Sequence, residues 1–500
     1  MKHRDSDVLG GRVAPWSMPV PVRAAEFEPL WPQHASLAVE TDLGAIASFG
    51  VTPQGVAEDC AHCDFQLLAD YPAHRRLGSG RAAFYKGKYL KGLGRTPLAA
   101  NWAECRDAWH GTGHMQASAA IRELVVTRYL QAKGLGHCVV PCEGILVRRM
   151  SPEFRRSFRE YAAGEGLQLA PIDHELQAIS IKPADFARWS NFLWLLVNAP
   201  ANRDTVSDFG WLLECYARGP HRPRPSADSC TPVTIVRAMS DAMAQAASNF
   251  KAYFLAGVYW GSFCNNSTMD GRFLDLELPT VLGEGRFYGV LPCSAESSGG
   301  RLEHMHTLGA EVLDHARQMR STITQVRRRL ADLEDRTSSH LLRAFIRALR
   351  DEMDTVFDED HWVWSRHRQR ELMAWMYEGV RTPRELDRAI EGMIAEGHRE
   401  PPGMAVTWTP AGLRIAKPEP GVRMDIHVPA GHVVPDGDQA AAERTVVTQA
   451  LDELDALTAV DELLSQTHVW LDRITNTVNP LQQRAPQWNC APKSDDRRAS

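Results

Sequence analysis

The sequence predicts an α+β protein in which a region of strands with one strong helix comes before a mainly helical region. Strand-like segments bounded by turns are indicated at residues 82–85, 89–91, 138–147 and 175–181. An amphipathic helix is predicted over 117–133, because apolar side chains recur there along one helical stripe until Gly134-Leu-Gly136 ends the pattern. Further helices are predicted at 184–197, 234–260, 301–335, 338–354, 366–379 and 439–475.

These elements divide the chain into four parts. They are an N-terminal arm with short helices (1–70), a mixed α/β lobe (71–200), a mainly helical lobe (201–400) and a C-terminal extension with a polar tail (401–500). A mixed N-lobe followed by a mainly helical C-lobe is the order of the protein-kinase-like two-lobe fold, which we expect here. We expect the extension, β-like at 401–435, to pack on the helical lobe rather than to bind substrate, because appended elements mostly bury apolar faces.

The composition is that of a globular protein and argues against some classes of partner. Of the 500 residues, 44% are hydrophobic and 24% charged, and the formal net charge is −6. Nucleic-acid binding is not expected, because no large basic excess is available to neutralise phosphates. No apolar run reaches the about 18 residues that a membrane helix needs, and residues 1–7 lack an apolar signal region. We therefore expect no membrane contact and a cytoplasmic location.

The chain has ten scattered cysteines. Cys60 and Cys63 have CxxC spacing, but no second pair follows at the spacing of a zinc ribbon or finger. Free thiols are therefore favoured over a structural zinc site.

The stretch from 257 to 277 is predicted to form a metal-binding hairpin. Asp270-Gly271 favours a tight turn between two short strands. Such a hairpin would bring Asn266 close to Asp275, and Mg²⁺ prefers oxygen ligands such as theirs. An Asn and an Asp are also the metal ligands of protein-kinase-type sites. The alternative, an ordinary surface hairpin, is the stronger interpretation for this stretch alone.

Two glycine-rich turns carry basic residues suited to phosphate. Gly78-Ser-Gly80-Arg81 combines backbone N–H groups with a bidentate donor. In the second turn, Lys91 ends an apolar strand and glycines follow it at 92 and 94. A strand-borne lysine that pairs with nucleotide phosphate needs a partner carboxylate, and Glu123 on the predicted helix supplies one. The alternative is a surface lysine beside a glutamate on a helix face.

With these segments in this order, the chain resembles the selenoprotein O family, a kinase-like family of protein adenylyltransferases. The family's strings Gly-Asp-Gly-Arg-Ala and Leu-Lys-Gly-Ala-Gly-Arg-Thr-Pro match residues 78–82 and 90–97. Its Gly-Asp-Gly before Ile-Arg-Glu matches Gly111-Thr-Gly113 before 121–123, and its metal loop matches Asn265-Asn266 and 275–277. The resemblance covers roughly residues 70–290 and implies ATP and Mg²⁺ (or Mn²⁺) as cofactors.

The resemblance assigns a role to each matching position. Lys91 would bind phosphate with Glu123 as its partner, and Asn266 and Asp275 would hold the metal. A family segment with two phosphate-binding arginines is similar to 181–192, where Lys182 replaces the first arginine and Arg188 matches the second. A segment at 149–156 has similar spacing but comes too early, so it ranks second. The remaining nucleotide-lining positions would be Gly78, Gly80, Arg81, Gly92, Gly94, Thr112 and Gly113.

Two departures from the family pattern bear on activity. Asn265 stands where the family has an Asp proposed as general base, and an amide cannot accept a proton at pH 7. Thr112 replaces an Asp that contacts the nucleotide. The resemblance favours transfer of AMP from ATP to a hydroxyl of a protein or peptide. The alternatives are phosphoryl transfer to a protein or a small metabolite, and a nucleotide-binding scaffold without turnover.

Overall fold

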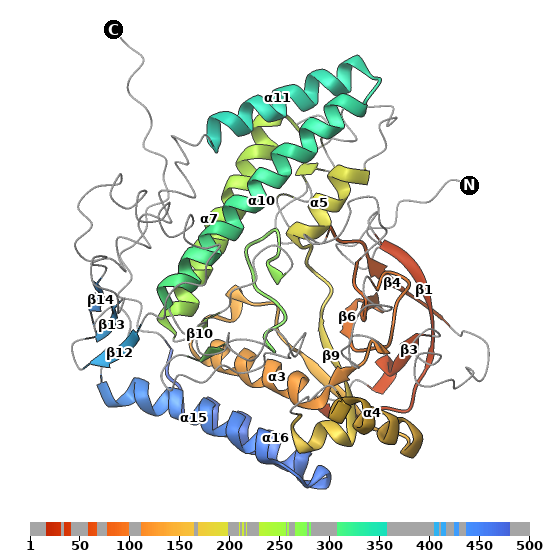
Figure 1. Ribbon diagram of the computed structural model, residues 1–500, viewed down its shortest axis with the longest axis vertical. Helices are drawn as coiled ribbons and strands as arrows, with labels where there is room; N and C mark the ends of the chain where they lie inside the picture. The colour runs from red at the N-terminus through yellow and green to blue at the C-terminus, as the bar shows by residue number, and fades with distance from the viewer. Residues whose placement is uncertain are drawn as a thin grey trace.

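The computed structural model is a mixed α+β protein with one large antiparallel sheet (Figure 1). The structure describes residues 17–31, 35–41, 59–67, 78–99, 112–164, 169–198, 230–256, 266–277, 308–357 and 437–480, with short pieces at 210, 213–214, 217, 258–259, 280–281, 405–409, 412–416 and 425–429. The helix predicted at 366–379 lies outside these residues. Among the helices that are described, none combines the length and apolar character needed to span a bilayer.

The large sheet gathers strands from the first 183 residues of the chain. Its strand order is β2-β8-β9-β6-β5-β4-β1-β3, and β7 also pairs with β9. The strands predicted at 82–85, 89–91 and 175–181 are confirmed. The bounds are β1 Ser17–Ala24, β2 Glu28–Trp31, β3 Val39–Thr41, β4 Asp59–Asp64, β5 Ala82–Tyr85, β6 Lys88–Lys91, β7 Met115–Gln116, β8 Gly144–Arg149 and β9 Leu176–Pro183.

The expectation of an arm with short helices over residues 1–70 is wrong for its described part. β4, β1 and β3 complete one end of the sheet, and β2 forms the other end. Buried Val20 and Val22 alternate with less buried neighbours along β1, as in a half-buried strand. Pro19 and Pro21 concealed this pattern. They are tolerated because this half of β1 pairs only with β4, so the ladder does not need their N–H groups.

The register between β6 and β9 decides which side chains share a face. Lys91 lies opposite Ser180, and Tyr89 lies opposite Lys182. Since alternate residues of a strand point to the same side, these four polar side chains lie on one face of the sheet. The residues that alternate with them, such as Leu90, Ile179 and Ile181, point to the other face and belong to its core. The sheet thus presents two lysines to whatever packs against its polar face.

Helix α3 (Ala117–Ala132) packs across this polar face, where its Glu123 accepts a hydrogen bond from Ser180 of β9. Most of the surface of α3 is buried, because a pair of C-terminal helices also packs against it. That pair, α15 (Gly437–Ala456) and α16 (Leu463–Thr477), lies alongside α3 in Figure 1. A buried ion pair between Lys133 and Glu443 joins the two layers. Among the residues that the structure describes, the helices of the C-terminal extension therefore pack on α3 and not on the helical lobe, where they were expected.

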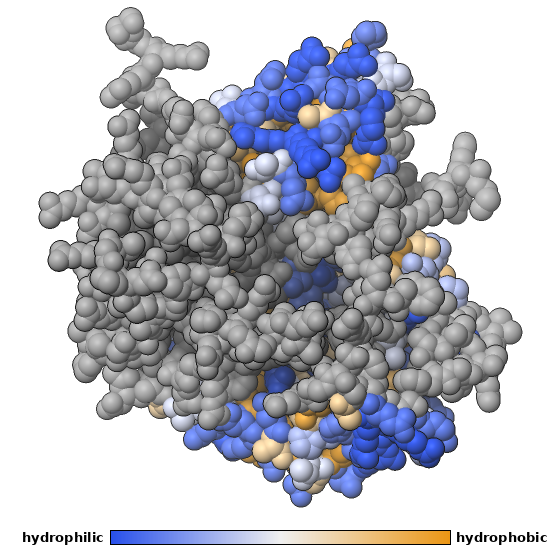
Figure 2. Space-filling model, viewed as in Figure 1, coloured by the Kyte–Doolittle hydropathy of each residue, from blue (hydrophilic) through white to orange (hydrophobic). Residues whose placement is uncertain are grey.

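Four further helices pack on one another: α5 (Trp189–Asn198), α7 (Pro232–Leu255), α10 (Leu308–Arg336) and α11 (His340–Val356). Their apolar side chains share one core with the strands (Figure 1). A shorter helix, α4 (Pro152–Gly164), follows β8. The surface over α10 and α11 is largely hydrophilic, as Figure 2 shows. A three-stranded antiparallel sheet, β12 (Ala405–Thr409), β13 (Gly412–Ala416) and β14 (Asp425–Pro429), confirms the β-like character predicted for 401–435.

Candidate nucleotide and metal site

Three basic side chains converge on Asp275, two from neighbouring strands and one from the segment that precedes α5. Lys91 Nζ at the end of β6 lies 3.0 Å from Asp275 Oδ1, and Lys182 Nζ from β9 lies 3.1 Å from the same oxygen. Arg188, just before α5, places its guanidinium 3.3 Å from Asp275 Oδ2. All four side chains are buried. The structure therefore brings together the lysines, the arginine and the aspartate that the sequence singled out.

The predicted hairpin is present. Gly271 N donates to Thr268 O at 3.0 Å, and Leu274 N donates to Asn266 O at 3.1 Å. Gly271 has a φ of +82°, and a Cβ there would lie 2.6 Å from a backbone nitrogen of α7, so glycine is required at the turn. The hairpin brings Asn266 and Asp275 together, and Arg188 Nη1 donates to both side chains at 3.3 Å.

Asp275 itself has an unusual backbone. Its φ is +61°, in the left-handed region that non-glycine residues rarely occupy. Such a conformation persists only where surrounding contacts hold it, and it is most frequent at functional sites. Here the hold comes from the three cations around the carboxylate and from the Leu276 N–H, which donates to Glu123 Oε1 at 3.2 Å.

The expected pairing of Lys91 with Glu123 is wrong. Glu123 Oε1 lies 2.7 Å from Lys182 Nζ, and neither side chain is exposed. Lys91 instead lies 2.5 Å from Glu277 Oε1. The sheet order explains the exchange: β9 lies between β8 and β6, and α3 packs over β8 and β9, so the lysine of β9 reaches the helix.

Glu277 is a site residue that the sequence analysis missed. Its Oε1 also accepts from Arg81 at 3.3 Å, and the side chain is only 6% exposed. Its Oε2 is buried and has no hydrogen-bond partner. The available signal was the alternation Leu274-Asp-Leu-Glu277, which places a second carboxylate two residues after Asp275.

The electrostatics of the cluster favour ionised carboxylates. Burial opposes the charge on Asp275, but Lys91, Lys182 and Arg188 together hold its pKa well below the ordinary value. Burial likewise opposes the charge on Glu277, and Lys91 and Arg81 lower its pKa. Lys182 stays protonated, because Glu123 and Asp275 raise its pKa despite the burial.

A network of side-chain hydrogen bonds connects Arg188 to Tyr89, Ser79 and Asp64. Arg188 Nη2 donates to the Tyr89 hydroxyl at 2.8 Å, and that hydroxyl lies 3.0 Å from Ser79 Oγ. Ser79 also hydrogen-bonds the buried Asp64, which accepts from Asn191 at 2.8 Å. The turn that contains Ser79 is therefore tied to the arginine through side chains.

The glycines proposed to line a nucleotide pack against the chain's own backbone. A Cβ on Gly78 would lie 1.9 Å from Asp64 O, one on Gly92 2.5 Å from Ala178 O, and one on Gly113 2.2 Å from Arg95 N. A Cβ on Gly80 would lie 3.1 Å from Ala99 Cα, and Gly94 has a φ of +100°. Close backbone packing thus accounts for Gly78, Gly92 and Gly113, and the left-handed backbone accounts for Gly94. Thr112 Oγ1 accepts from the N–H of His114 at 3.4 Å, and Asn265 lies outside the described residues.

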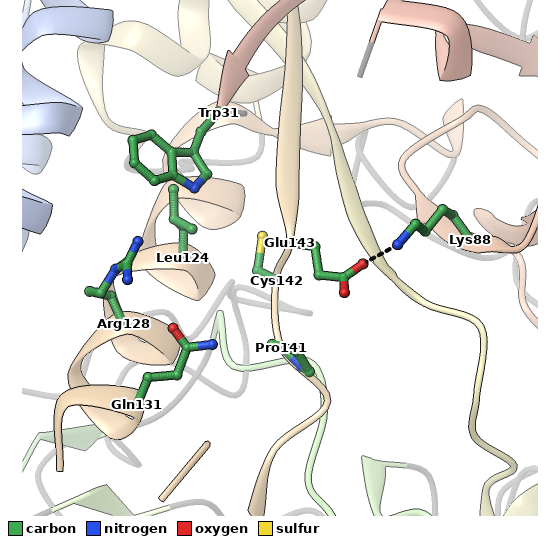
Figure 3. A pocket seen from close by; sticks show the side chains of 8 residues that line it. All are labelled: Trp31, Lys88, Leu124, Arg128, Gln131, Pro141, Cys142 and Glu143. Atoms are coloured by element: carbon green, nitrogen blue, oxygen red, sulfur yellow. Dashed lines mark hydrogen bonds and ion pairs between the residues drawn. The ribbon is translucent and has the colours of Figure 1, made fainter. Parts of the chain in front are cut away.

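Two cavities lie near the site without being lined by the charged cluster. One, of about 380 Å³, lies between α3 and the start of β8, where Arg128 and Trp31 face a Lys88–Glu143 ion pair of 2.6 Å across it (Figure 3). The other, of about 630 Å³, is lined by the hairpin turn at Asp270, by Asp185 and by α7.

No protein-family model matches this chain, and no curated protein is significantly similar to it.

Proposed function

We propose that the chain is an ATP- and Mg²⁺-dependent nucleotidyltransferase of protein-kinase-like fold, which transfers AMP from ATP to a hydroxyl of a protein or peptide. The observation that carries this proposal is the convergence of Lys91, Lys182 and Arg188 on Asp275, with Asn266 beside them. These residues stand at the positions where the sequence resembles the selenoprotein O family.

The charge balance of the cluster supports an anionic ligand. Four cationic side chains, Arg81, Lys91, Lys182 and Arg188, contact three carboxylates. A polyphosphate would add the missing negative charge and accept the hydrogen bonds of these donors. Catalysis of phosphoryl or nucleotidyl transfer is mostly positioning and charge stabilisation, which such a cluster can supply.

The residues present fit a divalent cation that binds oxygen. One carboxylate oxygen from each of Glu123, Asp275 and Glu277 lies within 4.8 Å of the others, and Glu277 Oε2 has no hydrogen-bond partner. Asn266 and Asp275 would hold Mg²⁺ or Mn²⁺, which when bound neutralises phosphate charge. Around it, Lys91, Lys182 and Arg188 would orient the phosphates, and Glu123 would keep Lys182 in place.

A second candidate function follows from Asn265. With an amide at the position of the expected base, the chain could bind the nucleotide without turnover. General-base catalysis typically contributes about 10²–10⁴-fold, so its loss alone does not abolish a reaction that rests on charge stabilisation. Transfer of the γ-phosphoryl group of ATP would use the same basic and metal-binding side chains. It is distinguished from AMP transfer by whether the γ-phosphate or the α-phosphate of ATP is transferred to the acceptor.

The test is incubation of the purified chain with α-³²P-ATP and, separately, with γ-³²P-ATP, each with Mg²⁺ and acceptor proteins. The control is Asp275→Asn, because asparagine tolerates a left-handed φ but lacks the charge. Glu143→Gln, outside the charged cluster, is the matched variant that keeps activity. Transfer of the α label that is lost in Asp275→Asn supports the proposal. Transfer of the γ label shows a kinase instead, and ATP binding without transfer shows a scaffold.

A further inference from the structure

Three carboxylates face the cationic cluster, and they differ in how their oxygens are used. Glu123 Oε1 contacts Lys182 and the Leu276 N–H, while its Oε2 accepts from Ser180 at 2.6 Å. Asp275 contacts lysines through Oδ1 and Arg188 through Oδ2. Glu277 contacts Lys91 and Arg81 through Oε1 alone. Its Oε2 differs from the other five oxygens, because no hydrogen bond reaches it.

A buried carboxylate oxygen without a partner needs a physical reason. Glu277 is 5% exposed, and its Oε2 is cut off from solvent. Leaving a charged acceptor unsatisfied is costly, and native proteins keep such groups mainly for strain, catalysis, or a bound water or ion. Here the oxygen belongs to a group whose carboxylates lie within 4.8 Å of one another, which is suitable for a hard divalent cation.

The charges around the site indicate when such a cation would bind. The cluster already has one more cationic side chain than carboxylates, so a free divalent ion would meet net repulsion. A nucleotide triphosphate that carries the ion reverses this balance. The ion is therefore expected to enter with the nucleotide, and Glu277 Oε2 is the protein oxygen left free to meet it.

We propose that Glu277 is a ligand of the nucleotide-borne divalent cation, acting through Oε2 beside Asp275. This inference rests on the proposed nucleotide site and adds a metal ligand to it. Glu277 then has two tasks. Its Oε1 holds Lys91 and Arg81 at the site before the nucleotide arrives, and its Oε2 binds the metal afterwards.

The experiment measures the affinity of a non-hydrolysable ATP analogue by calorimetry, in Mn²⁺ and in EDTA, for the full chain and for Glu277→Gln. The readout is the gain in affinity that Mn²⁺ gives. Removing a residue that only hydrogen-bonds a metal ligand typically lowers metal affinity by about 10–100-fold. Because Glu277 is proposed to bind the metal directly, we expect Glu277→Gln to reduce the affinity gain from Mn²⁺ by at least about tenfold. In EDTA its affinity should stay the same or rise, because Lys91 and Arg81 lose a competitor. Glu143→Gln, which removes a partly exposed Lys–Glu pair outside the cluster, should change neither value.

Other outcomes overturn the inference in different ways. If Glu277→Gln leaves the gain from Mn²⁺ unchanged, Glu277 is not a ligand, although the nucleotide site stands. An equal rise of affinity in Mn²⁺ and in EDTA is one form of this outcome and shows that Glu277 only pairs with the cations. If the unaltered chain binds the analogue in neither condition, the proposed function fails as well.

A second measurement does not depend on how the variant folds. The unaltered chain is labelled with ¹³C at its glutamate carboxyl groups, and the Mn²⁺–analogue complex is examined by electron–nuclear double resonance. A coupling to a directly bound glutamate carboxylate is expected. Its absence overturns the inference.

Discussion

Lys182 and Glu123 form a fully buried ion pair of 2.7 Å that joins strand β9 to helix α3. Both oxygens of Glu123 are used within this junction, one by Lys182 and the other by Ser180. Lys91, on the neighbouring strand, is left to Asp275 and Glu277. The junction therefore positions the helix, while Lys91 lies among the carboxylates suited to a metal.

Removing the lysine of this pair should destabilise the fold strongly. Lys182→Met leaves Glu123 charged and buried, which typically costs about 3–5 kcal/mol in the free energy of unfolding. Neutralising the partner as well, in Lys182→Met/Glu123→Gln, should recover part of this loss. The measurement is denaturant unfolding. Lys88→Met, which breaks a pair about one-third exposed, should cost less than about 1 kcal/mol; similar losses in both variants would contradict the argument.

The C-terminal helices should unfold together with the sheet and α3. Trp470 of α16 is fully buried in the core that contains α3, and its indole donates to Glu453 at 2.7 Å. Trp470→Ala should lower the free energy of unfolding by about 3–5 kcal/mol. Its neighbour Val469 is 46% exposed, so Val469→Ala should stay within about 0.5 kcal/mol of the parent. A separate early transition for α15 and α16 in hydrogen exchange would contradict a shared core.

Acid should destabilise the protein partly through His114. Burial, reinforced by Arg148, lowers the pKa of this histidine to about 3, whereas an unfolded histidine titrates near about 6.5. Between these values the unfolded chain binds a proton that the folded chain does not. The free energy of unfolding should therefore fall with decreasing pH below about 6.5, by up to about 1.4 kcal/mol per unit. His114→Gln should flatten this slope, and the exposed His468→Gln should not; equal slopes in all three chains would rule out His114 as the cause.

The cysteines of strand β4 should differ in reactivity. Cys60 is exposed and Cys63 is buried, because residues three apart on a strand point to opposite faces. Burial raises the pKa of Cys63 to about 12, which suppresses its thiolate at neutral pH. In the native protein, iodoacetamide should modify Cys60 and leave Cys63, Cys138 and Cys142 unmodified, as read by peptide mass spectrometry. Zinc held between Cys60 and Cys63 would instead protect both thiols until a chelator is added.

Local pattern was sufficient for several elements. The helix at 117–133, the strands at 82–85 and 89–91 and the Asp270-Gly271 turn all follow from neighbours within a few residues, and all are present. The amphipathic character predicted for the helix is wrong, because α3 is buried on most of its sides. The strands before residue 65 were missed because their signal is weak. Prolines occupy exposed positions of β1, where they argue against a strand, and β3 is only three residues long, so partners elsewhere in the sheet decide their conformation.

The groups that carry the proposed chemistry are evident from the order of residues: lysines at 91 and 182, an arginine at 188 and an Asn–Asp pair one hairpin apart. Their pairing is not, because the fold pairs Glu123 with Lys182 and Glu277 with Lys91. An ion pair depends on distances of a few ångströms between segments that lie far apart in the chain, and residue order does not specify such distances. Lys91 and Glu277 are separated by 186 positions in the chain, and only the folded structure brings them into contact.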